Sequence, residues 1–486
     1  MASSAPSTES SGPSLIPKPV AVAAPARDRR FPLVGREPHV LAFLLFAAYA
    51  TVSVGRYLRM GTRSYDLGIY EQTVRAYAHF QAPIAELKGP GYNVLGDHFS
   101  PVTMLLAPFY RLFPSSVTLL VAQAALFALS AVPVTRAATR ALGRARGLAL
   151  GVAYGLSWGL QNAVDFDFHE ICFAVPLIAF SLEALLARRW RAALLWGLPL
   201  VLVKEDQGLT LAVVATVVAL RARRHGATRV VPYALAVAVS GALATLLAFT
   251  VLIPAFNTAG SSDYLAKVGG GGPLDGLDVK LRTVLWLLVP TSGLLALRSP
   301  LVLAALPTLG WRFVASDHNY WGTAWHYSAV LMPMLFLALV DALPGARHSL
   351  RPWLRSYALH LPAAVLAASV ALTPSLPLGT LTEGSAYRVP AEVGAVERLL
   401  GTIPDGATVE VNIGPISRLT SRCRVFWIGR TGGLAPDYIA FNNRTGWVKD
   451  VPAYARQLHP RDTYALRGVI QGFVLLKRTS PERGAS

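Results

Sequence analysis

The chain contains repeated apolar runs, each close to the length that crosses a lipid bilayer. A transmembrane helix needs about 20 mostly apolar residues, and such runs recur between residues 40 and 371 of the 486-residue chain. Hydrophobic residues make up 53% of the chain and charged residues only 15%, which is unusual for a soluble protein. The sequence therefore predicts an all-α polytopic membrane protein.

The formal net charge of +18 comes from basic residues clustered in short loops between the apolar runs. This is the positive-inside distribution, which places these loops on the cytoplasmic side beside anionic lipid head groups. The lipid bilayer, and not nucleic acid, is therefore the expected partner. The chain has two cysteines, Cys172 and Cys423, so a disulfide framework is excluded and a thiolate metal site is not expected.

The alternation of Arg-rich and acid-rich loops predicts about eleven transmembrane or half-membrane helices in the plasma (inner) membrane, with the N-terminus inside. The basic lead before residue 40 favours an uncleaved anchor over a signal peptide. Whether the short segments 192–203 and 301–314 cross fully is left open. The expected crossings are residues 40–58, 116–134, 147–164, 171–187, 192–203, 209–220, 230–255, 281–297, 301–314, 329–343 and 359–371.

Three domains follow from this topology and from changes in composition. Residues 1–38 are Ser-, Pro- and Ala-rich and are expected to be a disordered cytoplasmic N-terminus. Residues 39–372 form the transmembrane domain with its outer loops, and residues 373–486 form a small extracytoplasmic α/β domain. In this last part, runs at 408–412, 424–428, 438–441 and 468–477 are predicted strands, and 391–400 a helix.

Acidic residues near the spans gather on the predicted outer side. Because acids contribute little to membrane topology, this bias favours one outward-facing polar cavity built from several loops. The alternative, that outer loops lack basic residues and acids merely fill in, stays open. The acids concerned are Asp66, Glu71, Asp97, Asp165, Asp167, Glu170, Glu205, Asp206 and Asp317.

Two acidic stretches follow the first span. At 65–72, apolar residues at helical spacing predict an amphipathic helix on the membrane face, with Asp66 at its start. Asp66 could then serve only as a helix cap. Asp97 precedes His98, which can donate to a phosphate, and Pro101, which favours the first turn of a helix. For Asp97 capping and a functional role both stay open.

Charged and aromatic residues mark the other predicted outer loops. Lys204, Glu205 and Asp206 lie at the tip of a hairpin of two short apolar arms, where they must reach water or pair with each other. Lys204 suits an anionic group. Trp325 and His326 belong to an aromatic loop that either anchors at the interface or stacks on a sugar or lipid.

The segments YDLGIYEQ at 65–72, DHFSP at 97–101, FH at 168–169, VKED at 203–206 and WHY at 325–327 carry a resemblance. Their order and spacing resemble a prokaryotic family of polytopic membrane proteins, known as a domain of unknown function and grouped with the GT-C glycosyltransferase superfamily. Glu170 stands where that family would more often have a proline.

The resemblance implies a membrane glycosyltransferase that moves a sugar from a polyprenyl-phosphate donor to an extracytoplasmic lipid, glycan or protein by an inverting mechanism. In that superfamily an acid of the first outer loop is the usual base, which here corresponds to Asp66, with Asp97 as a second catalytic candidate. The candidate substrate-binding residues are Glu71, His98, His169, Glu170, Lys204, Glu205, Asp206, Trp325 and His326.

Physical chemistry agrees with these roles. An acceptor hydroxyl needs a carboxylate to take its proton, and the departing phosphate needs cations or donors such as Lys204, His98 and His326. No cofactor is predicted with certainty, and a divalent cation (Mg or Mn) held by Asp97 and Glu170 is an alternative. A transporter or lipid flippase is the main rival function, and a non-catalytic envelope scaffold is a third.

Overall fold

The computed structural model describes residues 1–2, 35–63, 65–257, 272 and 274–479. Residues 3–34, most of the predicted disordered N-terminus, lie outside them, as does Ser64. The described helices and strands all belong to the unit Val34–Ser486.

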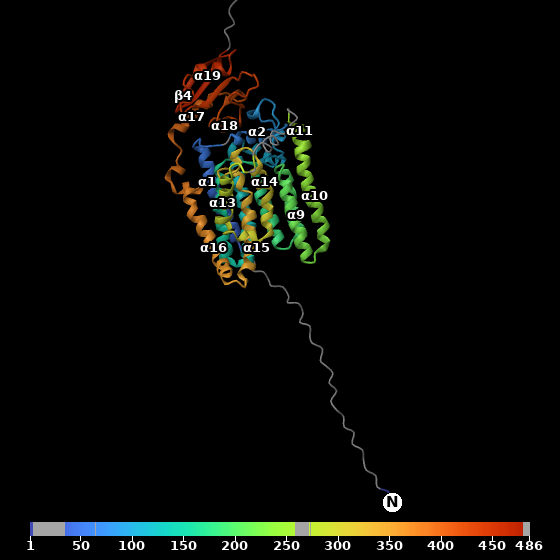
Figure 1. Cartoon of the computed structure of the whole chain (residues 1–486). Helices are drawn as coiled ribbons and strands as arrows, with labels where there is room; N and C mark the ends of the chain where they lie inside the picture. Colours follow the sequence, from blue (N-terminus) through green and yellow to red (C-terminus); the bar gives the residue numbers. More distant parts are fainter. Residues whose placement is uncertain (3–34, 64, 258–271, 273, 480–486) are drawn as a thin grey trace, which may run out of the picture. The chain divides into compact units, whose positions relative to one another are not determined.

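Every predicted crossing contains helix, so the predicted fold class, a polytopic bundle of helices with a small C-terminal sheet, is confirmed. Figure 1 shows the longer helices of this unit running side by side. They are α1 (Glu37–Leu58), α4 (Ser116–Leu142), α5 (Arg144–Gly155) with α6 (Trp158–Asp165), α7 (Ala174–Leu186), α8 (Trp190–Gly197), α9 (Gln207–Arg224), α10 (Val231–Leu247) with α11 (Ile253–Phe256), α13 (Leu277–Ser292), α14 (Leu306–Val314), α15 (Leu331–Arg347) and α16 (Pro352–Leu372).

Among the described residues, five helical segments are long and apolar enough to cross a membrane by length and composition. They differ in how much of their surface is covered. In His326–Arg347, which contains α15, 83% of the apolar window is buried, whereas the figure is 22% in Thr228–Phe256. An apolar helix that is buried all round belongs to a bundle core, while one with an uncovered apolar surface suits contact with lipid. Thus α15 is the central helix, and α10 lies at the periphery.

At the basic end of the bundle, buried ion pairs join the helices. Glu183 of α7 is almost fully buried and contacts three guanidinium groups. Arg136 lies 3.1 Å and Arg189 2.7 Å from the Glu183 carboxylate, and Arg140 completes the cluster. A buried carboxylate is tolerated only when paired in this way, so Glu183 fixes α4 against α7.

The predicted helix after the first span is present as α2 (Asp66–Ala78). It does not lie exposed on the membrane face, because all residues from Leu67 to Val74 are buried. Its outer side is covered by the C-terminal part of the chain, which sequence periodicity alone did not reveal. A shorter helix, α3 (Ala107–Leu112), packs beside it.

The C-terminal part, named here the sheet domain (residues 391–479), contains a five-stranded sheet of order β2-β1-β3-β5-β4. β1 pairs in parallel with β2 and β3, and β5 pairs antiparallel with β3 and β4. Its elements are α17 (Ala391–Gly401), β1 (Thr408–Val411), α18 (Ile416–Leu419), β2 (Arg424–Trp427), β3 (Tyr438–Asn442), α19 (Val451–Leu458), β4 (Thr463–Ile470) and β5 (Phe473–Thr479).

The single strand predicted at 468–477 is wrong, because the structure has a hairpin there. The chain reverses at Gln471 and Gly472, whose φ angles are 50° and 78°. Two successive residues with positive φ are typical of a tight hairpin turn. An apolar run on both sides of Gln471-Gly472 masked the turn in the sequence.

The sheet domain packs directly on α2. Gly68 is required at this contact, because a Cβ atom there would collide with Ile416 of α18 and with Leu87. Gln72 donates to the Val425 carbonyl at 2.9 Å, and Arg75 donates to the Cys423 carbonyl at 2.9 Å. The sheet domain and α2 therefore share one apolar core and one set of hydrogen bonds.

Candidate functional site

The first element of the site is a carboxylate–imidazole pair. Asp66 is the first residue of α2, and the preceding N-cap, Tyr65, makes no side-chain capping bond. The Asp66 Oδ2 atom lies 3.2 Å from Nε2 of His169, whose side chain is buried, whereas the side chain of Asp66 is 35% exposed. Asp66 therefore combines a fixed orientation with access to solvent, which a purely structural carboxylate does not need.

A stack of rings holds His169 in place. The His169 and His326 rings are 3.7 Å apart between centroids and 20° from parallel. Phe166 stacks on both imidazoles, and Trp325 meets Phe166 edge-on at 4.4 Å. Both imidazoles have a buried Nδ1 without a hydrogen-bond partner among the described residues.

A buried ion pair is the second element of the site. Lys204 Nζ lies 3.0 Å from Oε1 of Glu170, and Tyr70 of α2 donates to the other oxygen of that carboxylate. Burial by itself would raise the pKa of Glu170, but the positive charge of Lys204, with smaller effects of nearby histidines and the Tyr70 hydrogen bond, outweighs it and holds the pKa at about 2. Glu170 is therefore ionised at neutral pH and positions Lys204.

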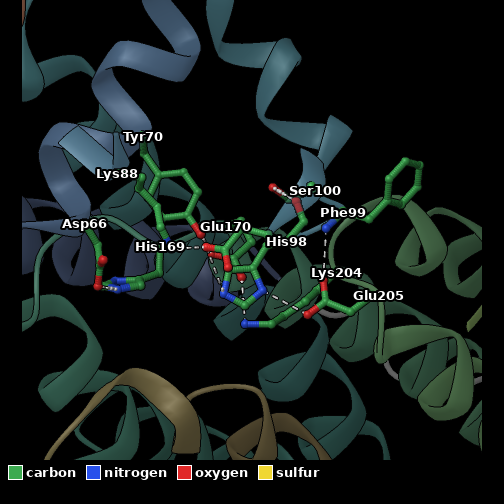
Figure 2. A network of polar contacts seen from close by, with 12 residues as sticks. Asp66, Tyr70, Lys88, His98, Phe99, Ser100, His169, Glu170, Lys204 and Glu205 are labelled. Carbon is green, nitrogen blue, oxygen red and sulfur yellow. Dashed lines mark hydrogen bonds and ion pairs between the residues drawn. The ribbon is translucent and has the colours of Figure 1, made fainter. Parts of the chain in front are cut away.

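A second set of charges lies beside it. His98 Nδ1 is 2.9 Å from Glu205, which also accepts from the Phe99 amide at 3.1 Å, and Lys88 Nζ is 2.5 Å from Asp97. Burial and Lys204 act to lower the pKa of His98, but Asp97 and Glu205 overcome them and raise it. Figure 2 shows His98, Glu205 and Lys88 near the residues described above, Asp66, His169, Glu170 and Lys204.

These groups surround a cavity of about 170 Å³. Seven predicted site residues line it, so segments predicted to share the outer side do meet at one place. These seven are Asp66, Asp97, His98, His169, Glu170, Lys204 and His326. The lining also includes Tyr65, Tyr70, Lys88, Tyr320 and Tyr327.

The other four predicted residues lie away from the cavity wall. Glu205 lies behind His98 as its partner, and Trp325 supports the ring stack through Phe166. Asp206 accepts from Trp311 Nε1 at 2.8 Å, and burial raises its pKa to about 6.

Glu71 lies on another side of α2. It is fully buried and accepts hydrogen bonds from Tyr110, Ser116 and Thr420. Burial raises the pKa of Glu71. Its contacts tie α2 to α4 and to the sheet domain, which is a structural position.

Lys88 and Tyr70 were missed by the sequence reasoning. Tyr70 belongs to the 65–72 segment and lies four residues after Asp66, a spacing that places both on one helix face. Lys88 gave a weaker signal, a single cation in the loop segment ELKGP at 86–90. Both supply polar atoms to the cavity.

The described residues contain no group of three or more His, Cys, Asp or Glu side chains placed to hold a metal ion. Asp97 and Glu170, the predicted cation ligands, are each paired with a lysine. A divalent cation would have to displace both lysines, so no chemical step is assigned to a metal here.

The bundle of apolar helices and the polar cavity at their ends are the features of a polytopic membrane protein. Residues 56–458 match the family model described as "Predicted membrane protein (DUF2079)". The chain belongs to this family, and the resemblance seen in its sequence motifs is confirmed.

Solved structures match this chain at low sequence identity, and one of them has a TM-score above 0.5. ArnT from Cupriavidus metallidurans, bound to undecaprenyl phosphate, is 15% identical with a TM-score of 0.56, and the alignment covers 91% of this chain and 98% of that one. The apo state of the same protein is 16% identical with a TM-score of 0.45, covering 89% and 97%. Arabinosyltransferase EmbB from Mycobacterium smegmatis is 15% identical with a TM-score of 0.33, covering 74% and 32%. No curated protein matches the sequence significantly.

Proposed function

We propose that the protein is a membrane glycosyltransferase that transfers a sugar from a polyprenyl-phosphate donor to an extracytoplasmic glycan, lipid or protein, with inversion at the anomeric carbon. The observation that carries the proposal is the placement of a partly exposed carboxylate, Asp66, in the same cavity as the cations Lys88 and Lys204. Sugar transfer needs both a proton acceptor for the attacking hydroxyl and positive charge for the departing phosphate.

Asp66 is the general base in this proposal. A hydroxyl group is a weak nucleophile, and a carboxylate within hydrogen-bond reach makes it stronger by taking its proton during attack. The contact with His169 leaves one Asp66 oxygen oriented by the imidazole. The stack on His326 restricts rotation of that imidazole, so the base is held in one geometry.

Lys204 and Lys88 receive the leaving phosphate. Both carry carboxylate partners, Glu170 and Asp97, that hold the ammonium groups in place before the donor arrives. Preorganised charge of this kind stabilises the negative charge that develops in the transition state. Tyr70 supports the arrangement by its hydrogen bond to Glu170.

The size of the cavity and the fold support a lipid-linked donor. A volume of about 170 Å³ is below the roughly 300–1,000 Å³ of typical small-molecule sites. It suits the reacting sugar-phosphate junction, with the lipid tail left in the bilayer. ArnT, which shares the fold, has been solved with undecaprenyl phosphate bound, and we assign a carrier of that chemical class to this chain.

The test compares turnover and stability of Asp66→Asn. Purified protein is incubated with radiolabelled polyprenyl-phosphate sugars and an envelope extract as the acceptor source. Loss of a general base lowers turnover by about 10² to 10⁴. Because the N-cap position of α2 is Tyr65 and not Asp66, and because Asn keeps the shape of Asp, stability should fall by no more than the roughly 1 kcal/mol of a lost cap.

Asp278→Asn is the matched control, since Asp278 also lies in the first turn of a helix, α13, but is exposed. It should leave both quantities unchanged. Near-parental turnover of Asp66→Asn at saturating donor would refute the assignment and direct the search to Asp97 or Asp167. Movement of labelled lipid across vesicle membranes without any sugar transfer would instead support a flippase.

A further inference from the structure

The segment 427–433, which begins with the last residue of strand β2 and continues as a loop, lies beside the cavity and is named the rim loop. Its first residue, Trp427, packs against Tyr65 with ring centroids 5.2 Å apart. A Cβ atom added at Gly432 would come within 2.9 Å of Pro90, so the loop also touches the segment that follows Lys88. Tyr65 and Lys88 both line the cavity. The sheet domain therefore contributes to the surroundings of the site.

Buried polar contacts hold the rim loop in position. The amide of Gly429 donates to Oε1 of Glu410, a fully buried carboxylate of β1. The other oxygen of Glu410 lies 2.7 Å from His459 Nε2. Because a buried carboxylate is costly unless each oxygen is paired, this arrangement indicates a defined loop conformation.

The rim loop presents a positive charge to solvent. Arg430 is exposed, and among the described residues it forms no ion pair with a carboxylate. Its neighbours Gly429, Gly432 and Gly433 are also exposed and have no side chains that would block approach. Burial raises the pKa of Tyr65, and the charges of Lys88 and Arg430 oppose that rise, which places the Arg430 charge within electrostatic reach of Tyr65.

We propose that the rim loop binds the acceptor, and that the acceptor is a saccharide carrying a carboxylate or phosphate group. This rests on the proposed function, in which Asp66 takes a proton from an acceptor arriving from the aqueous side. Tyr65 and Asp66 both line the cavity, so a sugar bound across Tyr65 and Trp427 can present a hydroxyl to the base. The guanidinium of Arg430 then pairs with the anionic group, a geometry that suits carboxylate and phosphate oxygens.

The test is a binding measurement with two matched probes, a hyaluronan tetrasaccharide and its carboxyl-reduced, uncharged form. Purified full-length protein should bind the anionic probe about tenfold or more tighter, as expected for a hydrogen bond to a charged group. Arg430→Gln should remove the preference for the anionic probe. Arg467→Gln is the control, because Arg467 is exposed on β4, at the far edge of the same sheet.

Equal binding of both probes by the parent protein would overturn the proposal. An equal loss of preference in Arg467→Gln would also overturn it, since the preference would then reflect net charge alone. This measurement needs no sugar transfer, so its failure is distinguishable from failure of the proposed function, which is judged by Asp66→Asn turnover. Where transfer is detected, Arg430→Gln should raise KM for acceptor and leave KM for donor unchanged.

Discussion

Variants of the Lys204–Glu170 pair can separate a structural role of Lys204 from a role in binding the donor phosphate. In the single variant Lys204→Met, the Glu170 carboxylate stays buried without its cation. The pKa of Glu170 is lowered from 4.5 to about 2, which corresponds to roughly 3 kcal/mol at about 1.4 kcal/mol per pKa unit. This agrees with the roughly 3–5 kcal/mol measured when one partner of a buried pair is removed.

The double variant Lys204→Met/Glu170→Gln removes both charges. The amide of Gln can still accept the hydrogen bond from Tyr70, so most of the lost stability should return. Binding of the donor should not return, because the cation that meets the phosphate is still absent. Thermal unfolding and binding of undecaprenyl phosphate, measured on the parent, both single variants and the double variant, complete the cycle.

The pH dependence of the cycle provides an internal check. Because the folded-state pKa of Glu170 is depressed, the stability from the pair is present above about pH 4.3 and is lost as the pH falls toward 2. The parent and the single variant Lys204→Met should therefore differ less in stability as the pH is lowered. If the double variant binds undecaprenyl phosphate as well as the parent does, Lys204 is structural and the donor assignment is wrong.

Three further outcomes are expected. Glu183→Gln should lower the free energy of unfolding by about 3–5 kcal/mol in thermal unfolding, because three guanidinium groups lose their shared partner. The control Glu392→Gln, at an exposed position, should change the free energy of unfolding by at most about 0.5 kcal/mol. The pKa of His98 is raised in the folded state, so its contribution to stability is present below about pH 6.5 and is lost as the pH rises through the pKa of the folded state. The free energy of unfolding of His98→Gln should therefore differ from that of the parent more at pH 5 than at pH 9, and an equal difference at the two pH values would contradict this. Thr463→Cys, on the predicted outer side, should react with an impermeant thiol reagent in intact cells, and His348→Cys, on the predicted inner side, only after lysis. Both positions are exposed and the two native cysteines are buried, so the reverse labelling pattern would invert the predicted topology.

The helical framework could be predicted because its causes are local in the sequence. Apolar length sets each crossing, and the Arg-rich loops set the direction of each crossing. The short arms on both sides of Lys204 illustrate this, since basic residues at both outer ends require a hairpin whose tip faces the acid-rich side. The tip does meet His98 and Glu170 in the structure. The prediction that these loops share one side of the membrane therefore identified seven of the fourteen residues that line the cavity, without any knowledge of distances.

The remaining parts depend on packing between segments far apart in the chain. Glu71 follows Tyr70 directly, and a step of one residue around a helix turns the side chain away from the face that carries Asp66. Which face is the site and which is the core depends on what covers α2. The cover is the sheet domain, more than 300 positions later in the chain, through contacts such as that of Thr420 with Glu71. No local pattern in 65–72 contains that information.

This dependence on the sheet domain bears on how the site is built. Asp66 and Tyr70 reach the cavity from α2, and α2 is fixed from behind by the hydrogen bonds of Gln72 and Arg75 to the sheet domain. The same domain supplies Trp427 at the cavity rim. One rigid contact thus sets both the direction of the proposed base and the position of the proposed acceptor loop. Gly68 belongs to this contact, because a Cβ atom there would collide with Ile416 of the sheet domain and with Leu87 and so disturb the packing that holds α2 and Asp66.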